Sequence, residues 1–311
     1  MKNIKFTIIT FYQFKKIKKI DNLQLLLKKF CSFHKIKGTI LIAKEGINGT
    51  VAGLEDAIDL LERELSKIKF NNLEYKKSFY KYMPFNILKV KIKKEIVTFN
   101  DSKVDVEKFK GKHVDPKDWG KLINDDDTIL IDVRNNFEVE LGSFKGSINP
   151  KTENFSEFKN YIKKNLHIDA NKKIAMYCTG GIRCEKASSY MLAKGFKNVF
   201  QLKGGILKYL EEVPLKNSEW KGECFVFDSR VSVKNEMKDG TYELCYGCRN
   251  PVSILDRQSK DYEKGISCPK CKNIISEKKK MKLRERNKQI DLAKKKGLYN
   301  PYIKYTPSDF S

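Results

Sequence analysis

Between residues 128 and 212, short apolar strand patterns alternate with amphipathic helix patterns, and this alternation limits the possible folds most. Strands are predicted at residues 128–133, 173–177 and 199–202, and helices at residues 156–165, 183–194 and 206–212. Because a helix follows each strand, successive strands can run in parallel with the helices packed on the sheet. Residues 125–215 are therefore predicted to form an α/β domain whose parallel sheet is covered on both faces.

The first hundred residues show a different order of elements. The expected strands are residues 6–12, 38–43, 49–52, 88–92 and 96–99, and the expected helices are residues 22–34 and 54–68. Glu45-Gly46 and Asn48-Gly49 mark a tight connection typical of a hairpin. The order β-α-β-β-α-β predicts a ferredoxin-like, or acylphosphatase-like, sandwich over residues 1–100. That fold indicates no particular function by itself.

The remaining segments carry less regular patterns. Residues 101–124 contain Gly111, Pro116 and Gly120 among mixed charges and are interpreted as a linker. Residues 216–311 break into short pieces and are interpreted as a Cys-rich C-terminal segment with a basic tail. No apolar run approaches the roughly 18 to 20 residues that span a bilayer, and no signal-peptide pattern is present. We therefore expect a cytoplasmic protein without a membrane partner.

The net charge of +24 raises the possibility of a polyanionic partner. Of the 63 basic residues, only eight are Arg, and the chain is also rich in Asn and Ile. Such a bias is typical of an AT-rich genome, in which most of the lysines are simply solvated. The charge alone therefore does not decide what the protein binds.

One loop carries the clearest chemical signal. Its sequence is Met176-Tyr177-Cys178-Thr179-Gly180-Gly181-Ile182-Arg183-Cys184. Cys178 lies between a predicted strand and a helix N-terminus, where backbone N–H groups and the helix dipole favour negative charge, so its thiol is expected to be acidic and nucleophilic. Gly180 and Gly181 allow backbone angles that turn N–H groups inward, and Arg183 is expected to place a fixed positive charge at the rim. The predicted catalytic residues are Cys178, Arg183 and Cys184, in a loop formed by Thr179, Gly180, Gly181 and Ile182.

Four of the eight cysteines form two matched pairs near the C-terminus. Cys245 and Cys248 are separated by two residues, as are Cys268 and Cys271, and 19 residues lie between the pairs. In a cytosolic chain, such spacing favours metal binding over a disulfide framework. We predict a closed, structural zinc site with four thiolate ligands, and a redox dithiol is the competing interpretation. Cys31 lies within an apolar helix and is expected to pack in the protein core. No role is assigned to Cys224.

Residues 272–296 hold eleven Lys or Arg against three Asp or Glu. A run of this kind is typical of a solvated helix, and beside a zinc site it also suits contacts with phosphates. The candidate RNA-binding residues are Lys278, Lys279, Lys280, Lys282, Arg284 and Arg286.

The cysteine loop resembles the active loop of the rhodanese family. The resemblance continues in Asp132-Val133-Arg134-Asn135-Asn136-Phe137-Glu138, in Gly142-Ser143-Phe144-Lys145-Gly146-Ser147-Ile148-Asn149-Pro150 and in Gln201-Leu202-Lys203-Gly204-Gly205-Ile206. It thus covers residues 125–215, and it implies that Cys178 can carry a persulfide. Four residues separate Cys178 from Arg183, as in rhodanese loops and one fewer than in the related tyrosine phosphatase loop, which disfavours phosphate-ester hydrolysis.

Further motifs extend the resemblance to the whole chain. They are Gly38-Thr39-Ile40-Leu41-Ile42-Ala43-Lys44-Glu45-Gly46-Ile47-Asn48-Gly49-Thr50-Val51-Ala52-Gly53, then Gly222-Glu223-Cys224-Phe225-Val226-Phe227-Asp228, and the two cysteine pairs. Together with the loop, they are similar to the rhodanese-domain tRNA uridine hydroxylase family. This resemblance implies an enzyme that uses molecular oxygen and an unidentified reductant to convert the wobble uridine at position 34 of tRNA to 5-hydroxyuridine.

Two other functions remain open at this stage. The loop itself fits equally well a sulfurtransferase that passes persulfide sulfur from Cys178 to cyanide, a thiol or tRNA. A non-catalytic RNA-binding or adaptor protein is a third possibility, although the intact Cys178, Arg183 and double glycine disfavour it. In the hydroxylase hypothesis, the Cys178 thiolate adds to carbon 6 of uracil, and Cys184 or a persulfide supplies reducing equivalents.

Overall fold

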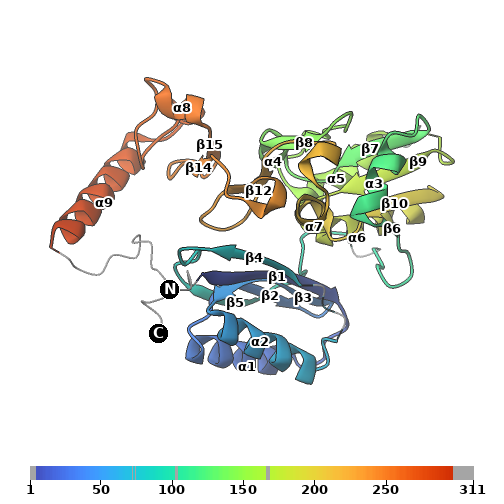
Figure 1. The fold of residues 1–311 in the computed structure, drawn as a ribbon, viewed down its shortest axis with the longest axis horizontal. Helices are drawn as coiled ribbons and strands as arrows, with labels where there is room; N and C mark the ends of the chain where they lie inside the picture. The colour runs from blue at the N-terminus through green and yellow to red at the C-terminus, as the bar shows by residue number, and fades with distance from the viewer. Residues whose placement is uncertain (1–4, 72, 74, 102–103, 166–168, 297–311) are drawn as a thin grey trace.

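The computed structural model describes residues 5–71, 73, 75–101, 104–165 and 169–296. These residues form two α/β domains followed by a C-terminal segment that ends in a long helix (Figure 1). The predicted combination of a ferredoxin-like domain, a rhodanese-like α/β domain and a C-terminal cluster of four cysteines is confirmed. Within the described residues, no helix is both long enough and apolar enough to span a membrane.

The first domain is a five-stranded sheet with two helices on one face (Figure 1). Its elements are β1 (Phe6–Phe14), α1 (Ile20–Phe33), β2 (Lys37–Ala43), β3 (Gly46–Gly53), α2 (Glu55–Lys67), β4 (Lys76–Tyr80) and β5 (Leu88–Ile92). The strand order is β4-β1-β3-β2-β5, and β2 and β3 form the predicted hairpin. The fifth strand, β5, adds to the sheet edge parallel to β2.

The two faces of this sheet have different chemistry because side chains alternate along each strand. Toward the helices, the core includes Ile9, Phe11, Ile40, Ile47 and Val51, all of them buried. The opposite face, which we call the hydroxyl face, carries Thr10, Tyr12, Thr39, Thr50 and Ser78. It faces the second domain rather than open solvent (Figure 1).

Two details of the sequence prediction for this domain are wrong. Residues 96–99 are not a strand: the Glu45 carboxylate accepts from Ile96 N–H at 2.7 Å, and the Asn48 side-chain amide donates to the Ile96 carbonyl at 3.0 Å, so side chains replace a strand partner. The fourth strand of the sandwich is instead β4, in which the covered positions are Lys76 and Ser78. Lys76 and Ser78 line a cavity and do not pack in an apolar core. The β4 segment therefore lacks the alternation of apolar residues by which a strand is predicted from sequence.

The second domain contains the predicted parallel sheet, in the order β6-β10-β9-β7. Its elements are β6 (Lys112–Val114), α3 (Pro116–Ile123), β7 (Thr128–Asp132), α4 (Asn136–Val139), β8 (Gly142–Phe144), η1 (Phe155–Glu157), α5 (Phe158–Lys164), β9 (Lys173–Tyr177), α6 (Ile182–Ala193), β10 (Asn198–Leu202) and α7 (Gly205–Glu212). One core lies between the sheet and α5 and α6, and a second lies between the sheet and α3 and α7. The linker expected over residues 101–124 is therefore shorter, because β6 and α3 belong to this domain.

The C-terminal segment starts against the second domain and ends away from it (Figure 1). Its elements are η2 (Leu215–Asn217), β11 (Trp220–Gly222), β12 (Cys224–Phe225), β13 (Ser232–Val233), η3 (Asn235–Met237), β14 (Glu243–Leu244), β15 (Pro251–Val252), α8 (Ile254–Gln258) and α9 (Glu277–Lys295). β11 pairs with β8, and Trp220 packs edge-on against Phe144 at a centroid distance of 5.1 Å. The Arg230 side chain donates to the Ser78 hydroxyl at 3.0 Å, so this segment also contacts the first domain.

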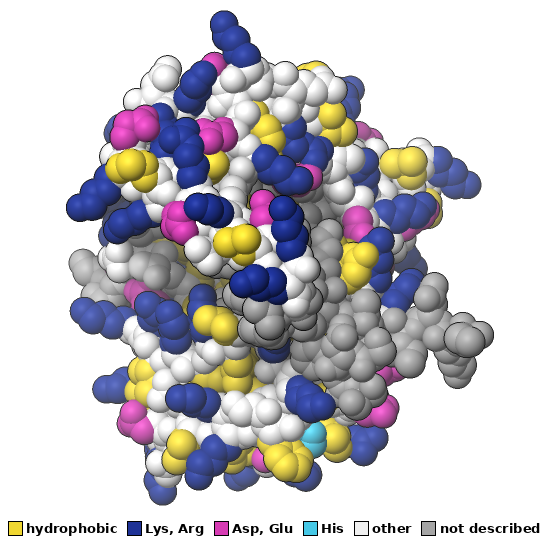
Figure 2. Space-filling view, turned by 90° about the vertical axis from the view of Figure 1, so that its left-hand side faces the viewer, with side chains coloured by type: hydrophobic (Ala, Val, Ile, Leu, Met, Phe, Trp, Pro, Cys, Tyr) yellow, Lys and Arg dark blue, Asp and Glu magenta, His cyan; other side chains and the backbone are white. Residues whose placement is uncertain are grey.

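The positive charge is distributed over the surface. On the face shown in Figure 2, Lys and Arg side chains are spread across the molecule, with Asp and Glu side chains among them. Some of the exposed lysines form ion pairs, such as Lys172 with Asp127 at 2.7 Å. This face therefore carries no single basic patch, as expected from a Lys-rich composition.

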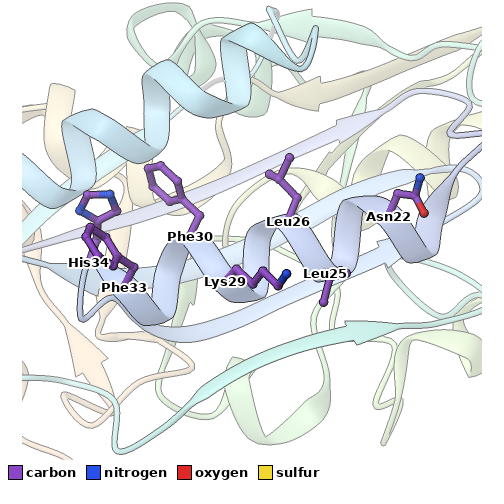
Figure 3. Close-up of a pocket in the computed structure, with 7 residues that line it drawn as sticks. All are labelled: Asn22, Leu25, Leu26, Lys29, Phe30, Phe33 and His34. Carbon is purple, nitrogen blue, oxygen red and sulfur yellow. The ribbon is translucent and has the colours of Figure 1, made fainter.

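The outward side of α1 carries apolar side chains that contact solvent. Leu25 is 55% exposed and Phe33 is 82% exposed. Figure 3 shows them along the helix with Leu26, Phe30 and His34, beside a shallow pocket. Because α1 covers the face of the first sheet that points away from the second domain, this pocket is separate from the cavity between the domains (Figure 1).

A fully buried ion pair in the second domain gives a stability prediction. The Arg134 guanidinium donates to both carboxylate oxygens of Asp132, at 2.9 and 2.6 Å, and also to the carbonyls of Glu138 and Gly142. Arg134→Met would leave the Asp132 charge buried without a partner, which costs about 3–5 kcal/mol. The free energy of unfolding in urea can be followed by tryptophan fluorescence, because both tryptophans, Trp119 and Trp220, belong to the core of this domain.

The matched control is Lys172→Met, which removes an exposed ion pair and should leave the unfolding midpoint unchanged. Equal midpoints for Arg134→Met and the control would contradict the assigned role of the buried pair.

Candidate functional site

The cysteine loop connects the end of β9 to the start of α6. Cys178 is 1% exposed, and the backbone N–H of Gly181 donates to its sulfur at 3.2 Å. Gly181 has φ +98°, a backbone conformation that favours glycine because it lacks a side chain. The structure thus places a backbone N–H group on the cysteine sulfur at a helix N-terminus, which is the arrangement the sequence predicted.

These surroundings make Cys178 acidic. Burial by itself would raise the pKa of the Cys178 thiol, but a hydrogen bond from the Cys184 thiol, the charge of Arg183 and backbone N–H groups of Cys184 and Arg183 outweigh it. The pKa of Cys178 is lowered to about 6. At neutral pH the residue is therefore mostly a thiolate, the reactive form of cysteine.

Cys184 is the hydrogen-bond donor to this thiolate. It is fully buried, and burial together with its hydrogen bond to Cys178 raises the pKa of Cys184 well above its ordinary value. Cys184 is thus protonated when Cys178 is ionised. The two predicted cysteines lie together as one thiolate and one thiol, a pair that can stabilise negative charge and supply a proton.

Arg183, predicted to place a fixed positive charge at the rim of the loop, lines the same cavity as Cys178. Its side chain is 9% exposed, and both terminal nitrogens donate to Glu138, at 2.6 and 2.8 Å, a partner that the sequence did not indicate. The same guanidinium donates to the Thr179 hydroxyl at 3.1 Å. Arg183 therefore ties the loop to Glu138, and its charge is balanced by that buried carboxylate.

The start of α7 supports the loop from the other side. The N–H groups of Ile206 and Leu207 donate to the carbonyls of Cys178 and Thr179 at 3.0 and 3.1 Å. Gly205 has φ +68°, and a Cβ at this position would lie 2.5 Å from the Cys178 carbonyl oxygen. Within the Gly204-Gly205-Ile206 motif, a glycine is therefore required at position 205, because the α7 backbone lies so close to the loop.

Two further residues at the site, Glu138 and Tyr12, were not singled out as site residues from the sequence. Glu138 lies within the motif that follows β7, which was the signal available for it. Tyr12, from the first domain, donates to Glu185 at 3.1 Å, and its hydroxyl lies 3.0 Å from where a Cβ on Gly181 would be. Burial, the charge of Glu185 and the charge of Cys178 raise the pKa of Tyr12, so it stays protonated. No sequence signal indicated that a residue so distant would reach the loop.

Cys178 opens onto a cavity of about 800 Å³ that all three parts of the chain enclose. The first domain contributes its hydroxyl face and Lys76, and the second contributes the cysteine loop and the start of α7. The C-terminal segment adds Val226, Phe227 and Arg230. This size and this mixture of apolar and polar walls are typical of pockets that bind small molecules or cofactors.

The four paired cysteines meet at one point. The sulfurs of Cys245, Cys248, Cys268 and Cys271 all lie within 4.8 Å of one another. The separations are 3.7 Å between Cys245 and Cys271 and 3.7 Å between Cys248 and Cys268. A tetrahedral zinc ion with Zn–S bonds of about 2.3 Å requires sulfurs about 3.8 Å apart. The cluster therefore fits a metal ion of this kind.

The basic tail forms α9, and its candidate residues have different surroundings. Arg284 pairs with Glu263 at 2.8 Å, Arg286 lies over the Tyr246 ring at 4.9 Å, and Lys280 pairs with Glu277 at 2.6 Å. Lys279 donates to a backbone carbonyl in the cysteine cluster at 2.6 Å. Lys278 and Lys282 are exposed. The contacts of Arg284, Arg286 and Lys279 anchor α9 to the segment that carries the cysteine cluster, whereas the Lys280–Glu277 pair lies within α9. The exposed Lys278 and Lys282 are accessible to a partner. Residues 297–311 of the predicted tail lie outside the described residues.

Comparisons with known proteins agree with this architecture. A family described as a UPF0176 acylphosphatase like domain matches residues 6–96, and the rhodanese-like domain family matches residues 115–212. Among solved structures, a rhodanese-related protein from Thermoplasma volcanium is 28% identical, with 33% of this chain and 93% of that chain covered and a TM-score of 0.27.

Two further solved structures each match about a third of the chain. The rhodanese-like domain of an Anabaena protein is 16% identical, covering 35% of this chain and 78% of that one, with a TM-score of 0.29. A rhodanese-like domain protein from Staphylococcus aureus is 19% identical, covering 32% and 90%, with a TM-score of 0.27. TM-scores this low carry no argument about function.

The acidity of Cys178 can be measured through its reaction with iodoacetamide. Because only the thiolate reacts, the alkylation rate should rise with pH through about 6 and be nearly level above pH about 7. Cys184→Ala removes a donor to the thiolate and should move the midpoint up by about one unit. Peptide mass spectrometry of Cys178 over a pH series gives both profiles. Cys31→Ala, in the first domain, is the control and should leave the Cys178 profile unchanged. A wild-type midpoint near the ordinary thiol pKa of about 8.5 would contradict the acidity assigned to Cys178.

The cysteine cluster predicts a bound metal. The purified protein should contain about one zinc per chain, and Cys268→Ser should lose most of it, since three thiolates hold zinc less tightly than four. Elemental analysis after gel filtration measures the zinc content. Cys224→Ser, which changes a buried cysteine outside the cluster, should keep its zinc; a wild-type protein without metal would contradict the prediction.

Proposed function

The chain carries the two-domain architecture of the UPF0176 family, and from this premise we propose that it hydroxylates the wobble uridine of tRNA to 5-hydroxyuridine. Molecular oxygen is the oxidant in this proposal, and a thiol-class reductant supplies two electrons. Cys178 is the nucleophile. The family resemblance suggests the substrate, and the site supports the type of chemistry.

One observation carries the proposal: an ionised Cys178 faces a cavity of about 800 Å³ that is built jointly by all three parts of the chain. A sulfurtransferase needs only the second domain, since the loop that would carry the persulfide lies entirely within it. Here the first domain and the C-terminal segment close over the same cysteine. This enclosure favours a reaction on a larger organic substrate that must be oriented before it reacts.

The chemistry uses the thiolate to activate the uracil ring. Addition of the Cys178 sulfur to carbon 6 forms a C–S bond and moves an electron pair toward carbon 5, which becomes electron-rich. Carbon 5 takes one oxygen atom from O₂, and the other leaves as water with two electrons and two protons from a pair of thiols. Loss of the carbon 5 proton and cleavage of the C–S bond then restore the ring and release Cys178. In sum, uridine, O₂ and two thiols give 5-hydroxyuridine, water and a disulfide.

The residues around Cys178 fit these steps. The protonated Cys184 donates a hydrogen bond to the thiolate before it reacts, and its thiol is one candidate for the reductant. The N–H of Gly181 stabilises the thiolate as it leaves. Tyr12 reaches the rim of the loop as a protonated hydroxyl that already donates to Glu185, so toward a substrate its oxygen can accept a hydrogen bond.

The C-terminal segment supplies a surface for the rest of the tRNA. We propose that the four cysteines hold a structural zinc ion, because their sulfur separations match tetrahedral coordination. The zinc would fix the loops on which α9 is anchored. Lys278, Lys282 and the neighbouring basic residues of α9 would then contact phosphates outside the cavity, without reading the sequence of bases.

Nucleoside mass spectrometry of bulk tRNA tests the proposal. A strain that lacks the protein should lose 5-hydroxyuridine and its derivatives, and expression of the wild type should restore them. Cys178→Ser and Cys178→Ala should fail to restore them, because neither side chain can form the thiolate adduct. Cys31→Ala is the matched control and should complement fully. Complementation by Cys178→Ser would show that Cys178 is not the nucleophile.

The same strains test the sulfurtransferase alternative. Under that alternative, the deletion strain keeps its normal 5-hydroxyuridine-derived nucleosides, and the purified protein transfers sulfur rapidly from thiosulfate to cyanide. This pair of results would replace hydroxylation by sulfur transfer as the function of Cys178.

A further inference from the structure

The sheet of the first domain presents hydroxyl groups to the cavity that contains Cys178. The side chains of Thr10 and Thr50 lie on adjacent strands, with their hydroxyl oxygens 3.1 Å apart, and Thr39 lies on the next strand. Ferredoxin-like sandwiches have helices on one face of the sheet only. Here the face without helices lies under the second domain, so its polar side chains are enclosed with the cysteine loop.

The choice of residue type on this face points to a polar ligand. Thr and Val have nearly the same shape, and both suit a β-strand, but only Thr carries a hydroxyl group. The hydroxyls of Thr10 and Thr50 meet at 3.1 Å, a contact that uses one of their two protons. Hydroxyl groups, unlike methyl groups, both donate and accept hydrogen bonds. A uracil base with its ribose presents two carbonyl oxygens, one N–H group and sugar hydroxyls. The threonine hydroxyls can therefore act as hydrogen-bond donors or acceptors toward the polar groups of a uracil nucleoside.

Positive charge lies beside these hydroxyls. Lys76 on β4 is 8% exposed, its ammonium group lies 5.3 Å from the centroid of the Tyr12 ring, and it lines the cavity. Its charge acts on the Glu211 carboxyl across the cavity, opposing the rise in pKa that burial causes there. Lys77, Lys93 and Arg230 also line the cavity. Lys76 is the cation that the sheet register places directly beside the threonines, because its partner position on β1 is Thr10, so it can meet an anionic group of a ligand lying on them.

We propose that the hydroxyl face, through Thr10 and Thr50, together with Lys76, is the binding wall for a single pyrimidine ribonucleotide whose base is presented to Cys178. The threonine hydroxyls hydrogen-bond the polar edge of the base or its ribose, and the Lys76 ammonium pairs with the adjoining phosphate. The first domain then binds the substrate, and the second domain supplies the reactive group. The identity of the base rests on the proposed function, whereas the location of the binding wall does not.

A protection experiment tests this wall on the full-length protein. A short anticodon stem-loop RNA with uridine at position 34 should slow alkylation of Cys178 by iodoacetamide, because an occupied cavity excludes the reagent. In Thr10→Val/Thr50→Val and in Lys76→Met, the RNA concentration that gives half protection should rise about tenfold or more. The alkylation rate without RNA, and its pH midpoint, should match the wild type, which shows that the loop is intact.

Two control variants match the chemical changes away from the cavity. Thr128→Val lies at the start of β7, at the opposite end of the parallel sheet from the cysteine loop, and Lys172→Met removes an exposed charge. Both should keep wild-type protection. In hydroxylation assays, the threonine and Lys76 variants should raise KM for the stem-loop about tenfold with a smaller change in kcat.

The outcomes separate this inference from the proposed function. Wild-type protection in the threonine variant and in Lys76→Met, or no protection in the wild type, overturns the binding wall even if the protein hydroxylates tRNA. Conversely, protection that the variants lose supports the wall even if the deletion strain retains its 5-hydroxyuridine.

Discussion

The buried carboxylate of Glu138 holds the reactive loop in place. It is fully buried, accepts two hydrogen bonds from Arg183, and also accepts from the Thr179 hydroxyl at 3.2 Å and the Asn135 N–H at 3.1 Å. Burial alone would raise the pKa of Glu138. The charge and hydrogen bonds of Arg183 nevertheless keep this pKa below its ordinary value. One carboxylate thus joins the turn after β7 to the cysteine loop, and removing either charge would leave the other buried and unpaired. The shape of the loop, and with it the acidity of Cys178, depends on this pair.

The sequence could predict the parts of the site that lie close together in the chain. The strand, the two glycines and the following helix around Cys178 are local features, so their geometry follows from short-range rules, and the paired cysteines carry their spacing with them. The enclosed cavity was not predictable in this way, because it depends on how Tyr12 and Lys76 of one domain approach a loop more than one hundred residues away. The ion pair of Arg183 was missed for the same reason: its partner Glu138 comes from another segment, and a single sequence does not show which charges meet.

Several buried charges among the described residues are balanced in pairs, in contrast to the large net charge of the chain. Arg134 pairs with Asp132, Arg183 with Glu138 and Arg230 with Asp228. Lys186 of α6 pairs with Glu45 of the first domain at 2.9 Å. The excess of 24 positive charges is therefore carried mainly by surface lysines. Such charges attract a polyanion from a distance and depend on salt, whereas the reactivity of Cys178 is set by groups in contact with it.

The alternation of apolar and hydroxyl side chains in the first sheet also has an evolutionary consequence. The fold depends on the residues that face the helices, and Val at Thr10, Thr39 and Thr50 would keep the shape at the cost of one cross-strand hydrogen bond between Thr10 and Thr50. The proposed binding wall gives a second reason for hydroxyls at these positions. Under the proposed function, descendants that no longer bind the ligand could drift toward apolar residues there while remaining folded, so these three positions should record whether a relative retains the binding wall.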